Sequence, residues 1–148
     1  MTGGGFIGQE AATAALQGPL NGVTGPKAGD KVTHGFELYC GVASRKRANN
    51  LEVNWGKGNN FKLIAMTSVN CFDDPSIASK PKDANFDTLT GTGAGLYNGK
   101  LATISWTFTD SGEPGKSDVA TMVIKDGLGN VVLSVNGPLK SGNQQADK

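Results

Sequence analysis

Apolar and polar residues alternate most regularly in the segment 103–109. One face of an extended strand there would carry apolar side chains, namely Ile104, Trp106 and Phe108, and threonine and serine would occupy the other face. A period of two, with β-branched and aromatic residues, predicts a half-buried strand rather than a helix. The alternation returns at 119–124 and 131–135, after two turn-rich connections. These three segments therefore predict an antiparallel meander.

The same alternation appears earlier in the chain. It covers four runs, 31–40, 51–55, 61–69 and 86–97. Beyond residue 135, Asn136-Gly-Pro138 interrupts the pattern, and the polar segment 139–148 is predicted to be a last edge strand or a frayed tail. Together these segments predict an all-β fold, an antiparallel β-sandwich of the immunoglobulin-like or jelly-roll-like kind with about seven to nine strands.

The segment 86–97 has glycine at every other position in its second half. Gly91, Gly93 and Gly95 leave one face of the predicted strand without side chains. Such a bare face predicts that a large group packs over it, or that the strand bends sharply there. The indole rings of Trp106 and Trp55 are the candidates for the covering group.

Residues 1–30 are predicted to be an N-terminal arm or edge segment, ahead of a β-sandwich domain at 31–148; the whole chain is one domain. Three interpretations of the arm stay open. It is a loosely attached lead-in, an edge strand packed on its own domain, or a strand added to a neighbouring molecule. In the third case Phe6 and Ile7 would make the self-association contact.

Composition and charge exclude some function classes. The chain has 148 residues, a net charge of +1 and only 18% charged residues, so it lacks the positive field that nucleic-acid binding requires. Twenty-two glycines, about twice the usual share, suit short strands joined by tight turns. No segment is apolar and long enough to insert into a membrane. The first residues do not form a signal peptide, and we expect a signal or further domains to precede Met1 in the native protein.

The chain has two cysteines, Cys40 and Cys71, with a separation of 31 residues. This spacing fits neither a zinc ribbon nor a thioredoxin motif. Two reduced, buried thiols or one disulfide both fit the pattern; because both cysteines end strand-like runs, we favour the disulfide. A disulfide predicts an extracellular or cell-surface location.

Catalytic chemistry has little support in the sequence. There is no Gly-x-Ser-x-Gly segment, and His34, the one histidine, lies on an apolar face, where a partly buried, hydrogen-bonded structural role is predicted. No catalytic residue and no cofactor are predicted. One metal site stays open: Asp110, Glu113 and Asp118 could bind calcium through their oxygens, or could instead accept backbone N–H groups within a turn.

Several segments resemble one known β-domain. They include Thr2-Gly-Gly-Gly-Phe-Ile7, Thr33-His-Gly-Phe36, Asn50-Leu-Glu-Val-Asn54, Thr107-Phe-Thr-Asp-Ser-Gly-Glu-Pro-Gly115 with Asp118, and Gly142-Asn-Gln-Gln145. Over nearly its whole length the chain resembles the post-COAP domain of large secreted bacterial and archaeal proteins. That family usually has a histidine two places after the final glutamine, where this chain has Asp147, which argues against a terminal histidine site. The resemblance implies an extracellular, non-enzymatic accessory or surface domain, with no catalytic residue.

The sequence therefore predicts a non-enzymatic structural or interaction module, acting in surface assembly, adhesion or as a spacer. Its expected partners are other protein subunits or neighbouring domains, with self-association through the arm or an edge strand as the specific hypothesis. The alternative is a carbohydrate-binding module, in which Trp55, Tyr39 or Tyr97 would stack on the rings of a glycan. Core packing is the competing interpretation for both tryptophans.

Overall fold

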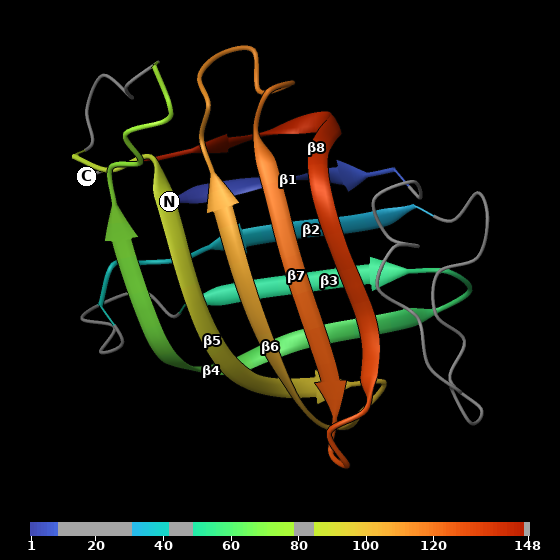
Figure 1. Cartoon of the computed structure of the whole chain (residues 1–148). Helices are drawn as coiled ribbons and strands as arrows, with labels where there is room; N and C mark the ends of the chain where they lie inside the picture. The colour runs from blue at the N-terminus through green and yellow to red at the C-terminus, as the bar shows by residue number, and fades with distance from the viewer. Residues whose placement is uncertain (9–30, 42–48, 79–84, 147–148) are drawn as a thin grey trace.

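The strands close into a barrel. A computed structural model of the chain describes residues 1–8, 31–41, 49–78 and 85–146, in which eight antiparallel strands follow one another in chain order and β8 pairs with β1 (Figure 1). The strands are β1 (Thr2–Ile7), β2 (Val32–Glu37), β3 (Asn50–Trp55), β4 (Asn59–Phe72), β5 (Thr88–Tyr97), β6 (Lys100–Thr109), β7 (Val119–Asp126) and β8 (Val131–Gln145). The predicted all-β, antiparallel class is confirmed. The predicted sandwich is wrong, because one continuous sheet closes on itself.

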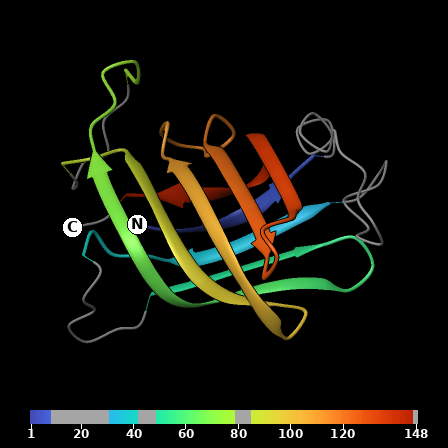
Figure 2. The same cartoon turned by 60° about the horizontal axis from the view of Figure 1, so that its bottom comes forward.

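Two long strands, β4 and β8, make this closure. The start of β4 pairs with β3 and the rest of it pairs with β5, while β8 pairs first with β7 and then with β1. Along β4 the register with β5 shifts twice, and such bulges bend a strand and increase its twist. As a result β1, β2 and β3 cross behind β5, β6 and β7, and Figure 2 shows the crossing from a second direction.

The predicted break at Asn136-Gly-Pro138 is also wrong. The strand continues through this segment: Pro138 is the last β8 residue opposite β7, and Leu139 is the first opposite β1. A proline lacks the N–H that a continuous ladder needs, so it is tolerated where the strand changes partners. The polar residues that follow are therefore the second half of a barrel strand rather than a separate edge strand or a tail.

The N-terminal segment is a full strand of the barrel. β1 lies between β2 and β8 and pairs with both, which matches the interpretation of a strand packed on its own domain for residues 2–7. The approach to β8 is close: a Cβ atom at Gly5 would lie 2.3 Å from the carbonyl oxygen of Ser141, and one at Gly142 would lie 2.1 Å from that of Gly4. Only glycine fits these positions. Residues 9–30 of the predicted arm lie outside the described residues.

Inward-facing side chains fill the barrel. Every second residue of β3, β6 and β7 is buried, as the alternation predicted. The prediction that a large group covers the glycine face of β5 is confirmed, because the Trp106 ring lies over Gly91 and Gly93. A Cβ atom at Gly91 would be 2.5 Å from Cζ2 of Trp106.

Within the described part of the chain, no helix has the length and hydropathy needed to cross a bilayer.

Candidate functional site

A connected set of polar side chains lies where the β3–β4 and β5–β6 turns meet. The Tyr97 ring stacks on Trp55, with centroids 5.5 Å apart and planes 10° apart. The Tyr97 hydroxyl donates to Asn59 Oδ1 at 3.2 Å, and Asn98 Nδ2 donates to the same oxygen at 3.0 Å. Asn98 occupies the left-handed region with φ 47°, as the tight Asn-Gly turn requires. The turn that joins β5 to β6 thus places an aromatic ring and two amides side by side.

The network continues onto the outer face of β3. The Asn60 backbone N–H donates to Asn98 Oδ1 at 2.9 Å, and Asn60 Nδ2 donates to Asn54 Oδ1 at 2.8 Å and to Glu52 Oε1 at 3.0 Å. We refer to Glu52, Asn54, Asn59, Asn60, Tyr97 and Asn98 as the amide surface. Amides, a carboxylate and an aromatic ring together match the hydrogen-bonding groups and flat faces of a sugar. Sequence reasoning selected Tyr97 but missed the amides, because their joining depends on two separate turns.

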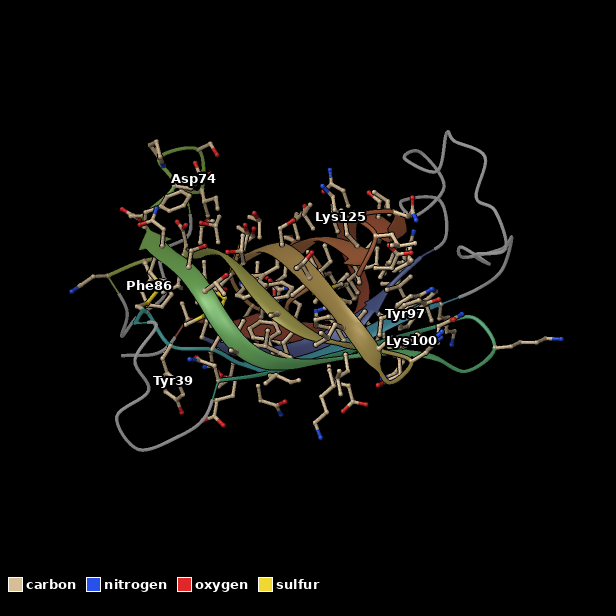
Figure 3. The ribbon with its side chains drawn as sticks, turned by 90° about the horizontal axis from the view of Figure 1, so that it is seen from below. Tyr39, Asp74, Phe86, Tyr97, Lys100 and Lys125 are labelled. Atoms are coloured by element: carbon tan, nitrogen blue, oxygen red, sulfur yellow. A yellow bond between two sulfur atoms is a disulfide. The ribbon has the colours of Figure 1, made fainter. Side chains whose placement is uncertain are left out.

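The three predicted stacking residues do not come together on one surface. Trp55 is only 2% exposed, so the prediction that it stacks on a glycan is wrong and core packing is its role. Tyr39 is half-buried at the opposite end of the barrel from Tyr97 (Figure 3), and its hydroxyl donates to Glu37. Tyr97 alone remains as a stacking candidate.

Asp110 and Asp118 hold the end of β8 against the β6–β7 loop. All four of their carboxylate oxygens accept backbone N–H groups at 2.7–3.0 Å. The donors belong to Ser111, Gly112, Gln144 and Ala146. Glu113 accepts from Asn143 Nδ2 at 2.9 Å. These bonds match the interpretation in which the acidic side chains accept backbone N–H groups within a turn. Among the described residues no group of three His, Cys, Asp or Glu is arranged to hold a metal ion.

The groups around Asp118 shift the pKa of its carboxyl group in opposite directions. Burial raises the pKa of Asp118 to about 6, and repulsion from Asp110 and Glu113 acts in the same direction. The N–H donors of Gln144 and Ser111 lower the pKa and offset part of this rise. Asp118 therefore takes up a proton as the pH falls through about 6.

His34 belongs to a stack of rings inside the barrel. Its imidazole lies 6.0 Å from the Phe36 ring and 5.5 Å from the Phe108 ring, with all three planes within 10°. Burial lowers its pKa to about 4, so the ring is neutral at pH 7. The predicted burial is confirmed at 6% exposure. Neither ring nitrogen has a hydrogen-bond partner among the described residues, contrary to the hydrogen-bonded role that we expected.

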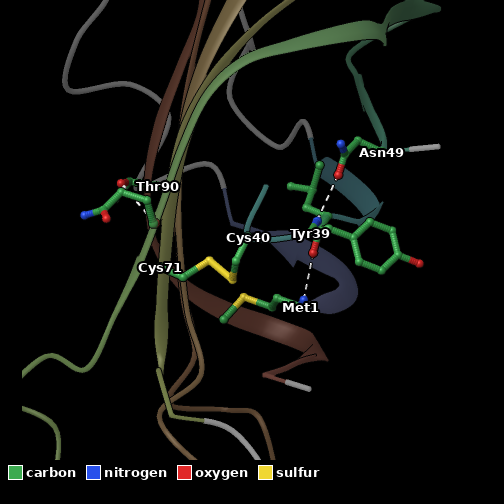
Figure 4. Close-up of a disulfide and its surroundings, with 8 residues drawn as sticks. Met1, Tyr39, Cys40, Asn49, Cys71 and Thr90 are labelled. Carbon is green, nitrogen blue, oxygen red and sulfur yellow. Dashed lines mark hydrogen bonds between the residues drawn. A yellow bond between two sulfur atoms is a disulfide. The ribbon is translucent and has the colours of Figure 1, made fainter. Parts of the chain in front are cut away.

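The predicted disulfide is confirmed. Cys40 and Cys71 are bonded, which joins the segment after β2 to the end of β4 (Figure 4). The Met1 amino group lies nearby and donates to the Leu38 carbonyl oxygen at 2.8 Å, which fixes the start of the chain at this end of the barrel. A disulfide is consistent with an oxidising, extracytoplasmic location.

Phe6 and Ile7, the residues predicted to make a self-association contact, are engaged within the chain. Ile7 is fully buried in the core. Phe6 is half-buried, and the Lys31 ammonium group lies 4.7 Å from the centroid of its ring. Both residues pair with β2 and β8 of the same chain, so they do not form an exposed arm.

Comparisons with protein-family models, with curated proteins and with solved structures find no match to this chain.

Proposed function

We propose that this chain is an extracellular, non-enzymatic interaction module, a closed barrel that holds binding surfaces in fixed positions. The proposal rests on the contacts made by the side chains that could act in catalysis or metal binding. The oxygens of Asp110 and Asp118 accept backbone N–H groups, and His34 is stacked in the core with a lowered pKa. These groups are engaged inside the fold, which leaves function to the outer surface.

The segments that carry the resemblance to the post-COAP domain support the same proposal. The Gly112–Gly115 segment lies against the end of β8: a Cβ atom at Gly115 would lie 2.7 Å from the Gly142 carbonyl oxygen, and Glu113 accepts from Asn143. The most specific segment of the resemblance thus contacts the segment that resembles the family's closing motif. Their residues fasten the last strand, a role that a structural module needs and that requires no reaction.

A capture experiment tests this function. Leu101, on β6, is 72% exposed and serves as a second surface position beside Tyr97. Immobilised wild-type chain is exposed to the surface and secreted proteins of the cell that produces it, beside Tyr97→Ala, Leu101→Lys and His34→Phe variants. We expect a protein partner that is retained by His34→Phe and lost by one of the two surface variants. Loss of the partner only in His34→Phe, or no partner above the level of an unrelated barrel, would contradict the proposal.

The amide surface favours a second candidate, carbohydrate binding. The half-exposed ring of Tyr97 is bonded through its hydroxyl to Asn59, and hydrogen bonds join Asn59 through Asn98 and Asn60 to Asn54 and Glu52. Binding to a glycan array should be lost in Tyr97→Ala and kept in Tyr39→Ala, the matched control at the other end of the barrel, provided that both variants unfold at the wild-type urea midpoint. Equal binding by the two variants would exclude this surface as the sugar site.

A further inference from the structure

The strand β4 is paired on both sides only at its start. Its pairs with β3 are confined to residues 59–62, whereas its pairs with β5 continue to Phe72. Over residues 64–72, no described residue pairs with the edge of β4 that faces away from β5. Figure 1 shows this half of β4 as the outermost strand of the front layer, and Figure 2 shows the same edge from a second direction. Beyond the corner where β3 meets it, β4 therefore presents an unpaired edge within the described part of the chain.

The carbonyl groups of β4 show which of its residues face that edge. The carbonyl oxygen of Phe72 accepts the N–H of the residue just before β5 at 3.2 Å, and that of Asn70 accepts from the Thr90 hydroxyl at 3.5 Å. Both carbonyls therefore point toward β5. In an antiparallel pair, alternate residues direct their N–H and C=O groups to opposite sides of the strand, so Val69 and Cys71 direct theirs to the unpaired edge. Donors and acceptors at this spacing are matched by another extended main chain.

Apart from its two bulges, this segment of β4 lacks the features that usually protect a strand edge. Residues 64–72 contain no charged residue, no proline and no glycine. Ile64 is 63% exposed and Phe72 is 37% exposed, one at each end of the segment. Among the described residues β8 is also paired on one side over its first half, but that half ends in Gly137 and Pro138, which do not suit the addition of a strand. We therefore assign strand addition to β4.

We propose that β4 pairs antiparallel with β4 of a second copy of this chain, across a two-fold axis at Asn70. The inference rests on the proposed function, because it names the partner of an interaction module. A second copy fits this edge because the segment is complementary to itself: residues 64–72 carry no charge that would be repelled when the segment faces its own copy. Because the contact uses the same edge of both molecules, it closes at a dimer.

The main chain determines where the axis lies. Both register shifts of β4 occur before Ser68, so residues 68–72 form a regular strand with Asn70 at its centre. With the axis at Asn70, Val69 of each copy lies opposite Cys71 of the other, and the outward N–H and C=O groups of these residues bond to one another. The two exposed Asn70 side chains then face each other, and each amide offers both a donor and an acceptor.

Sedimentation velocity of the full oxidised chain tests the dimer. A contact of one short strand is small, so we expect reversible dimerisation with a dissociation constant between about 10 µM and 1 mM. Asn70→Lys places two like charges opposite each other at the axis and should raise the dissociation constant about fivefold or more. Ser105→Lys is the matched control, because it adds the same charge at an exposed position of β6, a strand paired on both sides, and should dimerise like the wild type.

A charge-swapped pair of variants tests the two-fold arrangement. Asn70→Asp should dimerise as weakly as Asn70→Lys, whereas an equal mixture of the two should form a heterodimer at least as strongly as the wild type dimerises. A mixture that stays monomeric would overturn the arrangement, and so would Asn70→Lys that dimerises as strongly as the wild type. Every variant must keep the wild-type urea midpoint, which separates a lost contact from a lost fold.

Hydrogen exchange tests the main-chain contact without any substitution. In the wild type, the amides of residues 64–72 should exchange more slowly at millimolar than at micromolar protein concentration, because pairing protects the outward N–H groups. Residues 103–109 of β6 serve as the internal control and should exchange equally at both concentrations. Exchange in residues 64–72 that does not depend on concentration would overturn the contact.

A wild-type chain that stays monomeric up to about 1 mM would overturn the inference. If that monomer retained a surface protein in the capture experiment and Asn70→Lys lost it, the occupant of the edge would be a strand of that protein instead of a second copy. In that case the interaction-module function would stand while self-association fails. A monomer that captured nothing would contradict both, so the two failures are distinguishable.

Discussion

Replacing the buried histidine should change how the stability of the barrel depends on pH. His34 is 6% exposed and stacks on Phe36 and Phe108, and in the part of the chain that the structure describes neither of its ring nitrogens has a hydrogen-bond partner. His34→Phe keeps a flat ring in the stack and removes the titrating group. Near neutral pH no hydrogen bond is lost, so we expect a change in unfolding free energy of about 1 kcal/mol at most.

The sign and size follow from the pKa of His34. Burial lowers it from 6.5 in the unfolded chain to about 4 in the barrel, so the unfolded chain takes up the proton first as the pH falls. The stabilisation that depends on neutral His34 is complete above pH 6.5 and is lost as the pH falls toward 4. At 1.36 kcal/mol per pKa unit the whole loss is about 3 kcal/mol, of which about 2 kcal/mol is lost by about pH 5.

Asp118 titrates in the same range with the opposite sign. Its pKa is raised from 3.8 to about 6 by burial, so the folded chain takes up this proton first and gains stability as the pH falls from about 6 toward 3.8. The two titrations offset each other in the wild type, whose stability should therefore change little between neutral pH and about pH 5. The difference between wild type and His34→Phe isolates the histidine.

Urea unfolding followed by tryptophan fluorescence measures this difference, because Trp55 and Trp106 are both buried. From about pH 7.5 to about pH 5, the unfolding free energy of His34→Phe should rise relative to the wild type by about 2 kcal/mol. His34→Gln, which is polar but does not titrate, should show the same relative rise. A difference between wild type and both variants that does not change with pH would refute the reasoning.

Three further predictions concern the disulfide, the glycine face and calcium. Cys40→Ser with Cys71→Ser should lower the unfolding free energy by about 3–4 kcal/mol, the chain-entropy effect of a crosslink across 31 residues, and an unchanged urea midpoint would contradict it. Gly91→Ala should lower the unfolding free energy by about 1–3 kcal/mol because its Cβ would meet Trp106. Gly35→Ala should be neutral, since no atom of the described residues lies within 4 Å of its Cβ, and equal urea midpoints for the two variants would refute the covering role. The thermal midpoint should be the same in EDTA and in millimolar calcium, since the carboxylates of the 110–118 loop already accept backbone N–H groups, and a rise of several degrees in calcium would restore the metal hypothesis.

The sequence alone determined the local features of this protein. Alternation in 103–109 placed Ile104 and Phe108 in the core, and the bare face of β5 predicted a covering group, with Trp106 among the candidates, or a sharp bend. Cys40 and Cys71 ended two strand-like runs, which was enough to predict their disulfide. These properties depend on side-chain periodicity and on residues close along the chain, and both are readable without knowing how the sheet closes.

Only the tertiary structure decided that the sheet is a barrel. Alternation shows which face of a strand is buried. Because strands of a sandwich and strands of a barrel both bury one face, the same alternation fits either architecture. Closure depends on the pairing of Thr2 with Gln145 and on the bend of β8 after Pro138, where the local pattern indicated a break. The role of Asp118 could not be predicted from the sequence either, because the backbone N–H of Gln144 reaches its carboxylate only when the last strand has crossed to β1.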